Sequence, residues 1–280
     1  MTTAIATPKL PAGRTIALGA SRIAYEVKTY FRQGDSVFFT FLFPVIFLTI
    51  FSVAFSEGSF GTTASGAKVT AADFYLPAML AAGVLLSGLQ NMSIDIANEK
   101  SDGTLKRLGG SPLPVLSYFT GKIGQVIVTG IMQSALLLVV AVVAFRVSLP
   151  TDPAKWLTFA WVFLLGVSTC AVLGIALSAL PRSGKSATAV IIPITLILQF
   201  ISGVYLSFSQ LPEWLQNFAS IFPLKWLAQG MRSVFLPDSF KALEMGGTWN
   251  LGGVALVTSI WLVVGLVACR LTFRWIRKDS

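Results

Sequence analysis

Six long apolar blocks, separated by shorter polar segments, dominate the chain. A helix needs about 20 apolar residues to cross the ~30 Å hydrocarbon core of a membrane. Each block is close to that length or longer, and together they cover residues 37–55, 75–94, 123–145, 156–180, 187–206 and 251–269. The pattern therefore predicts an all-α integral membrane protein with six transmembrane helices, a transmembrane domain over residues 37–269.

The segment before the first block, residues 1–36, has a helical pattern of its own. Arg22, Glu26 and Arg32 lie off an apolar stripe that comprises Ile16, Ala20, Ile23, Val27 and Tyr30. Such a stripe is typical of an amphipathic helix in the membrane interface. We predict a basic tail followed by an interfacial helix.

The long segment between the fifth and sixth blocks holds two short apolar faces on either side of Pro223. The first face comprises Leu211, Leu215, Phe218 and Phe222, and the second Leu227, Met231 and Phe235. Neither face is long enough to cross a membrane, and a proline ends a helix that precedes it. We predict two short external helices that dip into the outer leaflet.

Composition supports the membrane assignment, and charge predicts the orientation. Only 12% of the residues are charged, whereas a soluble domain carries about 25%. Most of the 21 Lys and Arg residues lie in the N-terminal tail, the second and fourth loops and the C-terminal tail 270–280. The positive-inside rule then predicts a multi-pass protein of the inner or plasma cell membrane with both termini in the cytoplasm. The net charge of +9 indicates contact with anionic membrane lipid, and we expect no nucleic-acid partner.

The predicted transmembrane cores lack ionisable side chains. No block contains Asp, Glu, Lys or Arg, and the chain has no His. Ion-driven transporters and channels usually need such groups in the membrane, and acid–base or metal chemistry needs them in a pocket. We therefore expect no catalytic, cofactor-binding or metal site in this chain, and energy for transport has to come from a partner. A secondary transporter or channel, and a membrane scaffold without transport, stay open as alternatives.

Some conspicuous residues have plain explanations. Asp95 and Glu99 follow the second block, and we interpret them as solvated at the interface, with a cytoplasmic contact as the alternative. The sequence SGKS at 183–186 ends like a phosphate-binding loop, but Ala179 replaces the first glycine. In the fourth block small residues recur at every fourth position, and we interpret this stripe as packing within one subunit; it comprises Gly166, Cys170, Gly174 and Ser178.

The most informative loop joins the second and third blocks and reads NEKSDGTLKRLGGSPLP over residues 98–114. Glycines and prolines bound a short helical piece at 104–108, with Leu105 and Leu108 on one face and Lys106 and Arg107 on the other. One interpretation is a basic loop on lipid headgroups. The other is a helix that docks into a groove of a cytoplasmic partner, with its leucines as the anchors.

Two groups of motifs stand in a distinctive order. Between the second and third blocks are Glu99, Gly103-Thr104-Leu105 and Ser111-Pro112. After the fifth block come Ser202, Gly203, Leu211, Pro212, Trp214, Leu215, Pro223 and Arg232. In these motifs and their spacing among six spans, the chain resembles the permeases of type-2 ATP-binding-cassette exporters, the daunorubicin-resistance, nodulation-factor and polysaccharide-export group.

This resemblance implies a half-permease that dimerises with a second copy or a paralogue and works with a separate ATP-binding-cassette ATPase. ATP and Mg²⁺ would be bound by that ATPase and no cofactor by this chain. The segment 99–112 would be the coupling helix, with coupling residues Glu99, Asp102, Gly103, Thr104, Leu105, Lys106, Arg107 and Leu108. The two short external helices would be the re-entrant pair of the family. Gly109-Gly110 departs from the family, which usually has bulkier apolar residues there.

Aromatic and amide side chains inside the blocks indicate a substrate pathway. Phe43, Phe47 and Phe51 recur at every fourth position of the first block, close to helical spacing. Amides in the other blocks would be costly in hydrocarbon without a partner, and these are Gln90, Asn91, Gln133 and Gln199. Uncharged aromatic and amide walls favour an amphiphilic drug or lipid-like substrate. A polysaccharide or glycolipid is the alternative, as is a phenylalanine face that only contacts lipid.

Overall fold

The computed structural model describes residues 12–56, 58, 60–62, 66, 68–111 and 113–272, with side chains from residue 17 onward. In this part of the chain six helices are long and apolar enough to cross a membrane. They are α2 (Gly34–Ala54), the continuous helix Ala71–Ser101, α6 (Val115–Phe145), α7 (Pro153–Leu177), α8 (Gly184–Ile201) and α11 (Leu251–Thr272). The predicted all-α membrane fold with six spans is confirmed.

The second and third spans are longer than the apolar pattern predicts. The second span comprises α3 (Ala71–Leu85), the π-helical turn η1 (Leu86–Asn91) and α4 (Met92–Ser101), beyond the predicted end at residue 94. The third begins at Val115 instead of residue 123. The added turns carry Asp95, Glu99 and Lys122, so ionisable side chains lie at this end of both helices, and the predicted apolar cores contain none. Hydropathy misses these turns because it cannot see the partners that stabilise a buried charge.

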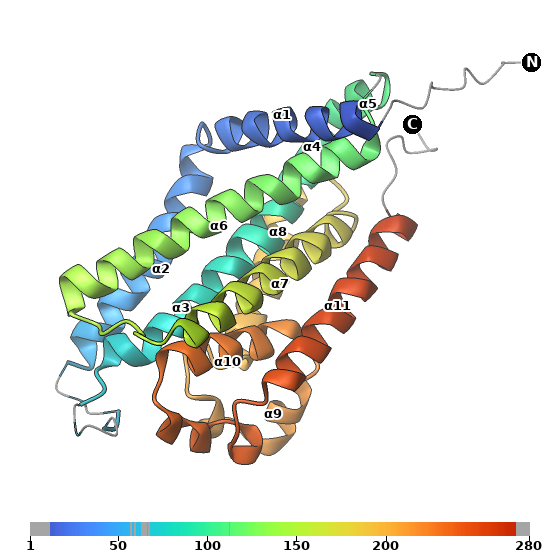
Figure 1. The fold of residues 1–280 in the computed structure, drawn as a ribbon. Coiled ribbons are helices and arrows are strands. Elements are labelled where there is room, and N and C mark those ends of the chain that lie inside the picture. Colours follow the sequence, from blue (N-terminus) through green and yellow to red (C-terminus); the bar gives the residue numbers. More distant parts are fainter. Residues whose placement is uncertain are drawn as a thin grey trace, which may run out of the picture.

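The continuous helix Ala71–Ser101 forms the centre of the bundle and contacts α2, α6, α7 and α8 (Figure 1). Its most apolar window is 89% buried, compared with 22% for α2 and α8 and 17% for α11. The peripheral helices therefore leave most of their apolar side chains on the outer surface. Lipid or another protein chain has to cover these side chains, because exposure of so much apolar surface to water is unfavourable.

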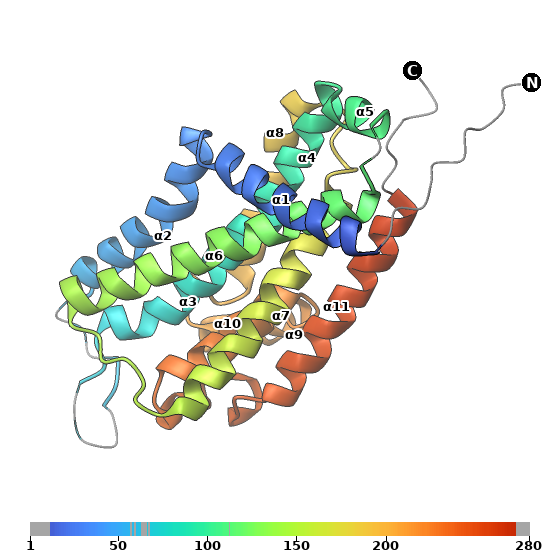
Figure 2. The ribbon, with the colours of Figure 1, turned by 45° about the horizontal axis from the view of Figure 1, so that its top comes forward.

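The short helices lie at the two ends of the bundle. Both ribbon views show α1 (Ala12–Tyr30) lying across the first turns of α6, with α5 (Thr104–Gly109) at the same end (Figures 1 and 2). At the opposite end lie α9 (Glu213–Ala219), α10 (Pro223–Phe235) and the 3-10 turns η2 (Phe208–Gln210), η3 (Asp238–Leu243) and η4 (Met245–Gly247). Two short helices are thus present on either side of Pro223, which begins α10.

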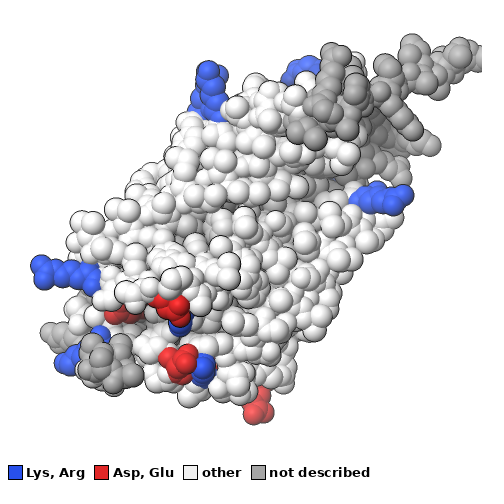
Figure 3. Space-filling model, viewed as in Figure 1, with Lys and Arg blue, Asp and Glu red and all other residues white. Residues whose placement is uncertain are grey.

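Charged side chains avoid the middle of the bundle surface. On the face in Figure 3, the charged side chains of the described residues lie toward the ends of the helices, and a broad uncharged band separates them. This distribution is typical of a bundle that crosses a membrane, because a charge at the bilayer centre is costly.

Helix α1 packs against α6 with a face that overlaps the predicted stripe at Ile23 and Val27 but also includes Gly19 and Glu26. Gly19 lies against Thr120, and Ile23 lies against Gly124, where a Cβ atom would come within 2.5 Å of its side chain. Glu26, predicted off the stripe, is 3% exposed, whereas Ala20, predicted on it, is exposed. The prediction is therefore wrong for Ala20 and Glu26, and the ion pairs of Glu26 with Arg22 and Lys122 account for its burial. Residues 1–11 of the predicted tail and 273–280 of the basic C-terminal tail lie outside the described residues.

Small residues bring η1 and α7 close together. A Cβ atom at Gly174 would lie 2.4 Å from the carbonyl oxygen of Gly88, and one at Gly88 would lie 2.7 Å from Cβ of Cys170. The Oγ of Ser93 donates a hydrogen bond of 2.9 Å to the carbonyl oxygen of Gly174. The stripe of small residues in the fourth span therefore serves packing within one subunit, as its spacing was interpreted.

Candidate functional site

A buried ion network joins three helices at the α5 end of the bundle. The Nζ of Lys122 on α6 lies 2.9 Å from Oε2 of Glu26 on α1 and 2.6 Å from Oε1 of Glu99 on α4. Tyr118 donates its hydroxyl proton to Oε2 of Glu99 at 2.6 Å, and Nη2 of Arg22 lies 2.6 Å from Oε1 of Glu26. Lys122 and Glu26 are each 3% exposed. The network ties the interfacial helix to the helix that leads into α5.

The network corrects the interpretation of Asp95 and Glu99 as solvated. Glu99 pairs with Lys122 and accepts a hydrogen bond from Tyr118, so its negative charge is compensated within the subunit. Asp95, one helical turn earlier, is half-buried and lines a cavity described below. Sequence reasoning missed this arrangement because Glu26 and Lys122 are distant in the chain and no local pattern links them.

Helix α5 presents its basic face and buries its apolar one. Its first turn follows Gly103, which has a φ of 78°, and the backbone N–H of Thr104 donates to Oδ1 of Asp102 at 2.8 Å. Leu105 is 3% exposed in the hydrophobic core of the chain, whereas Lys106 and Arg107 are exposed. The prediction that the leucines anchor a partner is therefore wrong for Leu105, whose side chain already packs within this subunit.

A cavity of about 490 Å³ lies between α2, the η1–α4 part of the central helix and α8. Its walls are mostly apolar, with Phe39 and Phe43 on α2 and Leu86 on η1, and hydroxyl, amide and carboxyl groups are placed among them. The other lining residues are Asp35, Ser36, Thr40, Gln90, Asn91, Ile94, Asp95, Thr188, Ile192, Thr195, Leu196 and Gln199. This volume is within the range of small-molecule sites, roughly 300–1,000 Å³.

The π-helical turn η1 directs two amides into this cavity. The Nδ2 of Asn91 donates to Oγ1 of Thr40 on α2 at 2.6 Å, and Oγ1 of Thr195 on α8 donates to Oε1 of Gln90 at 2.6 Å. Single π turns inside α-helices are rare and occur frequently at functional sites. Here the turn lets one helix reach both walls of the cavity with adjacent residues.

The structure brings together only some of the predicted pathway residues. Phe43, Gln90, Asn91 and Gln199 line the cavity. Phe47 and Phe51 instead pack inside the protein, with ring centroids 5.3 Å from Tyr205 and 4.5 Å from Tyr75, respectively. Gln133 is 1% exposed and lies against Gly83 of α3, outside the cavity lining. The predicted phenylalanine face is therefore divided between a cavity and a packed interface.

Sequence reasoning missed a polar stripe on α8. Thr188, Ile192, Thr195 and Gln199 line the cavity from one face of that helix, and their spacing of four, three and four residues is helical. Threonines in an apolar span are a usable signal, because their hydroxyl groups need partners there. Thr40 on α2 follows the same rule, since it accepts a hydrogen bond from Asn91.

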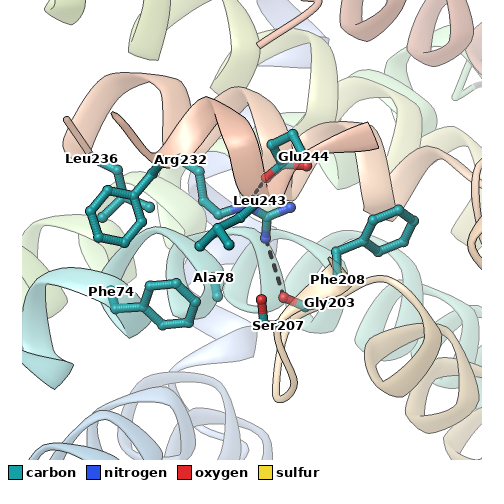
Figure 4. Close-up of a pocket in the computed structure, with 10 residues that line it drawn as sticks. Phe74, Ala78, Gly203, Ser207, Phe208, Arg232, Leu236, Leu243 and Glu244 are labelled. Carbon is teal, nitrogen blue, oxygen red and sulfur yellow. Dashed lines mark hydrogen bonds and ion pairs between the residues drawn. The ribbon is translucent and has the colours of Figure 1, made fainter. Parts of the chain in front are cut away.

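At the α9–α10 end, the side chain of Arg232 binds two loops and so forms a clasp between them. Its guanidinium pairs with Glu244, and its Nη1 donates to the carbonyl oxygen of Gly203 at 3.2 Å (Figure 4). Gly203 follows the end of α8 with a φ of 74°, so the clasp joins α8, α10 and the turn before α11. The pocket beside Arg232 has a volume of about 10 Å³, too small for a substrate. The role that the structure supports for Arg232 is structural.

Other side chains at the α9–α10 end differ in how exposed they are. On α9, Trp214 is 69% exposed, and Leu215 is half-buried. Leu211 and Pro212 immediately precede the helix. On α10, by contrast, Lys225 is 1% exposed and donates to Gln229, and its burial lowers its pKa to about 8.

A six-span helical bundle with an amide-lined cavity between peripheral helices is the architecture of a membrane transport protein. A family model described as "ABC-2 family transporter protein" matches residues 62–272, well over half of the chain. The chain belongs to this family of membrane transporter proteins.

Two curated relatives agree with this assignment. Both are described as "Probable multidrug ABC transporter permease YbhR", one from Escherichia coli strain K12 and one from Escherichia coli O157:H7. Each is 22% identical over 178 residues, which cover 64% of this chain and 48% of the relative. The chain thus spans about half the length of these relatives.

Proposed function

We propose that this chain is the permease half of an ATP-driven exporter of amphiphilic, drug-like or lipid-like compounds. The cavity between α2, η1–α4 and α8 is the observation that carries the proposal. Its aromatic and aliphatic walls suit an apolar body, and a few amides and hydroxyl groups can orient a polar end. The wall surface is mostly apolar, which favours an amphiphile over a sugar polymer.

In this proposal two permease chains assemble side by side. The helices that border the cavity, α2 and α8, carry large apolar side chains on their outer faces, among them Ile46, Ile50, Ile197 and Phe200. A second copy or a paralogue that covers these faces would close the cavity laterally and exclude lipid from it. The apolar character of the faces supports this assembly, because such interfaces need close packing without charge.

The same proposal assigns energy coupling to the α5 end. A separate ATPase, which binds ATP and Mg²⁺, would contact the exposed basic face of α5, formed by Lys106 and Arg107. Movement of α5 would reach α1 and α6 through Glu99, since Lys122 holds these helices together. In this arrangement both chain termini face the cytoplasm, consistent with the charge distribution of the sequence.

Compound-stimulated ATP hydrolysis tests the cavity. The permease is purified with its ATPase in lipid nanodiscs, and hydrolysis is titrated with rhodamine 6G, Triton X-100 and lysophosphatidylcholine. We expect Phe43→Ala to shift the half-stimulating concentration of at least one compound threefold or more, because its ring lines the cavity. Phe38→Ala is the matched control, since this exposed ring on the same helix is not part of the lining.

The outcomes separate the parts of the proposal. If Phe43→Ala and Phe38→Ala both keep the parent's compound profile, the substrate pathway does not use this cavity. If no compound stimulates the parent complex, the export of amphiphiles is itself contradicted. Basal hydrolysis should stay within about twofold in both variants, because neither residue is near α5.

A further inference from the structure

Two acidic side chains lie in the lining of this mostly apolar cavity. Asp35 and Asp95 are among its lining residues, and no Lys or Arg is. Among the described residues, neither carboxylate takes part in an ion pair or a side-chain hydrogen bond. Asp95 is half-buried, and a half-buried carboxylate without a partner is costly.

The neighbouring ion network does not compensate Asp95. Arg22 and Lys122 supply two positive charges, and Glu26 and Glu99 supply two negative ones, so the network is balanced in itself. Lys122 acts electrostatically on Asp95, but both of its contacts are made to the other carboxylates, and these repel Asp95. Asp95 therefore carries the surplus negative charge of this region.

The two carboxylates place the negative charge at one end of the cavity. Helix α2 starts at the α1 end of the bundle, so Asp35 lies there, and α4 leads toward the same end past Asp95. Phe43 and Leu86 line the cavity further along α2 and the central helix, toward the opposite end. A molecule with a charged head and an apolar body would fit with the head toward Asp95 and the body between these two side chains.

Building on the proposed function, we propose that the cavity binds amphiphilic organic cations and that Asp95 is the counter-charge that selects them. A cation beside Asp95 replaces the water that a half-buried carboxylate would otherwise require, and the apolar walls hold the rest of the ligand. An anion of the same shape meets two uncompensated carboxylates and is repelled. Asp35 is exposed at the mouth, so solvent screens it and its contribution is smaller.

Three probes of similar shape and different charge test the proposal: tetraphenylphosphonium (cation), triphenylphosphine oxide (neutral) and tetraphenylborate (anion). Their binding to the purified full-length permease in nanodiscs is measured by equilibrium dialysis, with empty nanodiscs subtracted. We expect tetraphenylphosphonium to bind most tightly. Asp95→Asn should weaken its binding about tenfold, the size of one close charge pair in a partly screened site, and leave the neutral probe within twofold.

Two further variants keep the test decisive. Asp95→Glu should retain the preference for the cation, because it keeps the charge in nearly the same place. Glu213→Gln is the matched control, since it removes an exposed carboxylate at the other end of the bundle and should change nothing. The parent and all three variants are compared by size-exclusion profile before dialysis.

Each pattern of binding has one meaning. The role of Asp95 is overturned if Asp95→Asn binds tetraphenylphosphonium as tightly as the parent does, or if the parent binds tetraphenylborate more tightly than the cation. In either case, binding of the neutral probe to the parent would leave the proposed function intact. If none of the three probes binds the parent above empty nanodiscs, the cavity is not an amphiphile site, and both proposals fail.

Discussion

Replacement of Lys122 by methionine should destabilise the folded chain strongly. The substitution keeps most of the apolar stem but leaves Glu26 and Glu99 without the ammonium group that lies 2.9 Å and 2.6 Å from their carboxylate oxygens. Removal of one partner from a buried ion pair costs about 3–5 kcal/mol. We expect the lower end, about 3 kcal/mol, because the Glu99 side chain is 19% exposed and Arg22 still contacts Glu26.

Thermal unfolding of the purified permease, followed by tryptophan fluorescence, measures this effect. A loss of about 3 kcal/mol corresponds to a decrease in Tm of about 6–12 °C for a chain of this size. Lys100→Met is the control, since Lys100 is exposed on α4, and its Tm should change by less than about 2 °C. The double variant Lys122→Met with Glu99→Gln should recover part of the loss. A Tm of Lys122→Met equal to that of Lys100→Met would refute the network as a stabilising element.

Three further predictions follow from other contacts. Gly174→Ala should cost about 1–3 kcal/mol, because its Cβ would lie 2.4 Å from a carbonyl oxygen, whereas Gly252→Ala, with nothing within 4 Å, should not destabilise the protein in the same melts. The pKa of Lys225 falls from 10.5 in the unfolded chain to about 8 in the folded one. Between pH 8 and 10.5 the unfolded chain binds more protons than the folded one, so the free energy of unfolding should rise with pH in this range. Denaturant titrations of Lys225→Met should lack this rise. Arg107→Glu should reduce co-purification of the ATPase and leave the Tm of the permease unchanged. The control is Arg146→Glu at the opposite end of the bundle, which should co-purify with the ATPase as the parent does. If the two variants recover the same amount of ATPase, the coupling role of α5 is contradicted.

The number and order of the helices could be predicted from the sequence, and some side-chain roles could not. Apolar length alone predicts six spans, because the hydrocarbon core sets a minimum that α2 and α11 meet without help from other residues. The ends of α4 and α6 were missed because Glu99 and Lys122 look like boundary charges until each is seen as the partner of the other. Pairing across separate helices is a tertiary property that hydropathy does not contain.

The candidate site shows the same division. Of the four amides assigned to a substrate pathway from the sequence, Gln90, Asn91 and Gln199 line the cavity and Gln133 does not; their role in a pathway stays a prediction. Phe47 and Phe43 have the same residue type and helical spacing, yet only Phe43 lines the cavity, because the aromatic ring of Tyr205 covers Phe47. Which of two equivalent phenylalanines is open depends on a residue more than 150 positions away.

The π-helical turn η1 sets the phase of everything that follows it on the central helix. A π turn holds one residue more than the α turn that it replaces, and each residue of an α-helix rotates the chain by about 100°. Return of residues 86–91 to regular α geometry without the loss of a residue would leave α3 in place and rotate Asp95 and Glu99 by about 100° to other faces. Straightening of this turn would then remove the carboxylate of Asp95 from the cavity and break the contact of Glu99 with Lys122 at the same time, whereas deletion of one residue together with the π turn would keep both. In a lineage that loses the π turn but keeps the number of residues, the ligand preference and the seating of the interfacial helix are expected to change together.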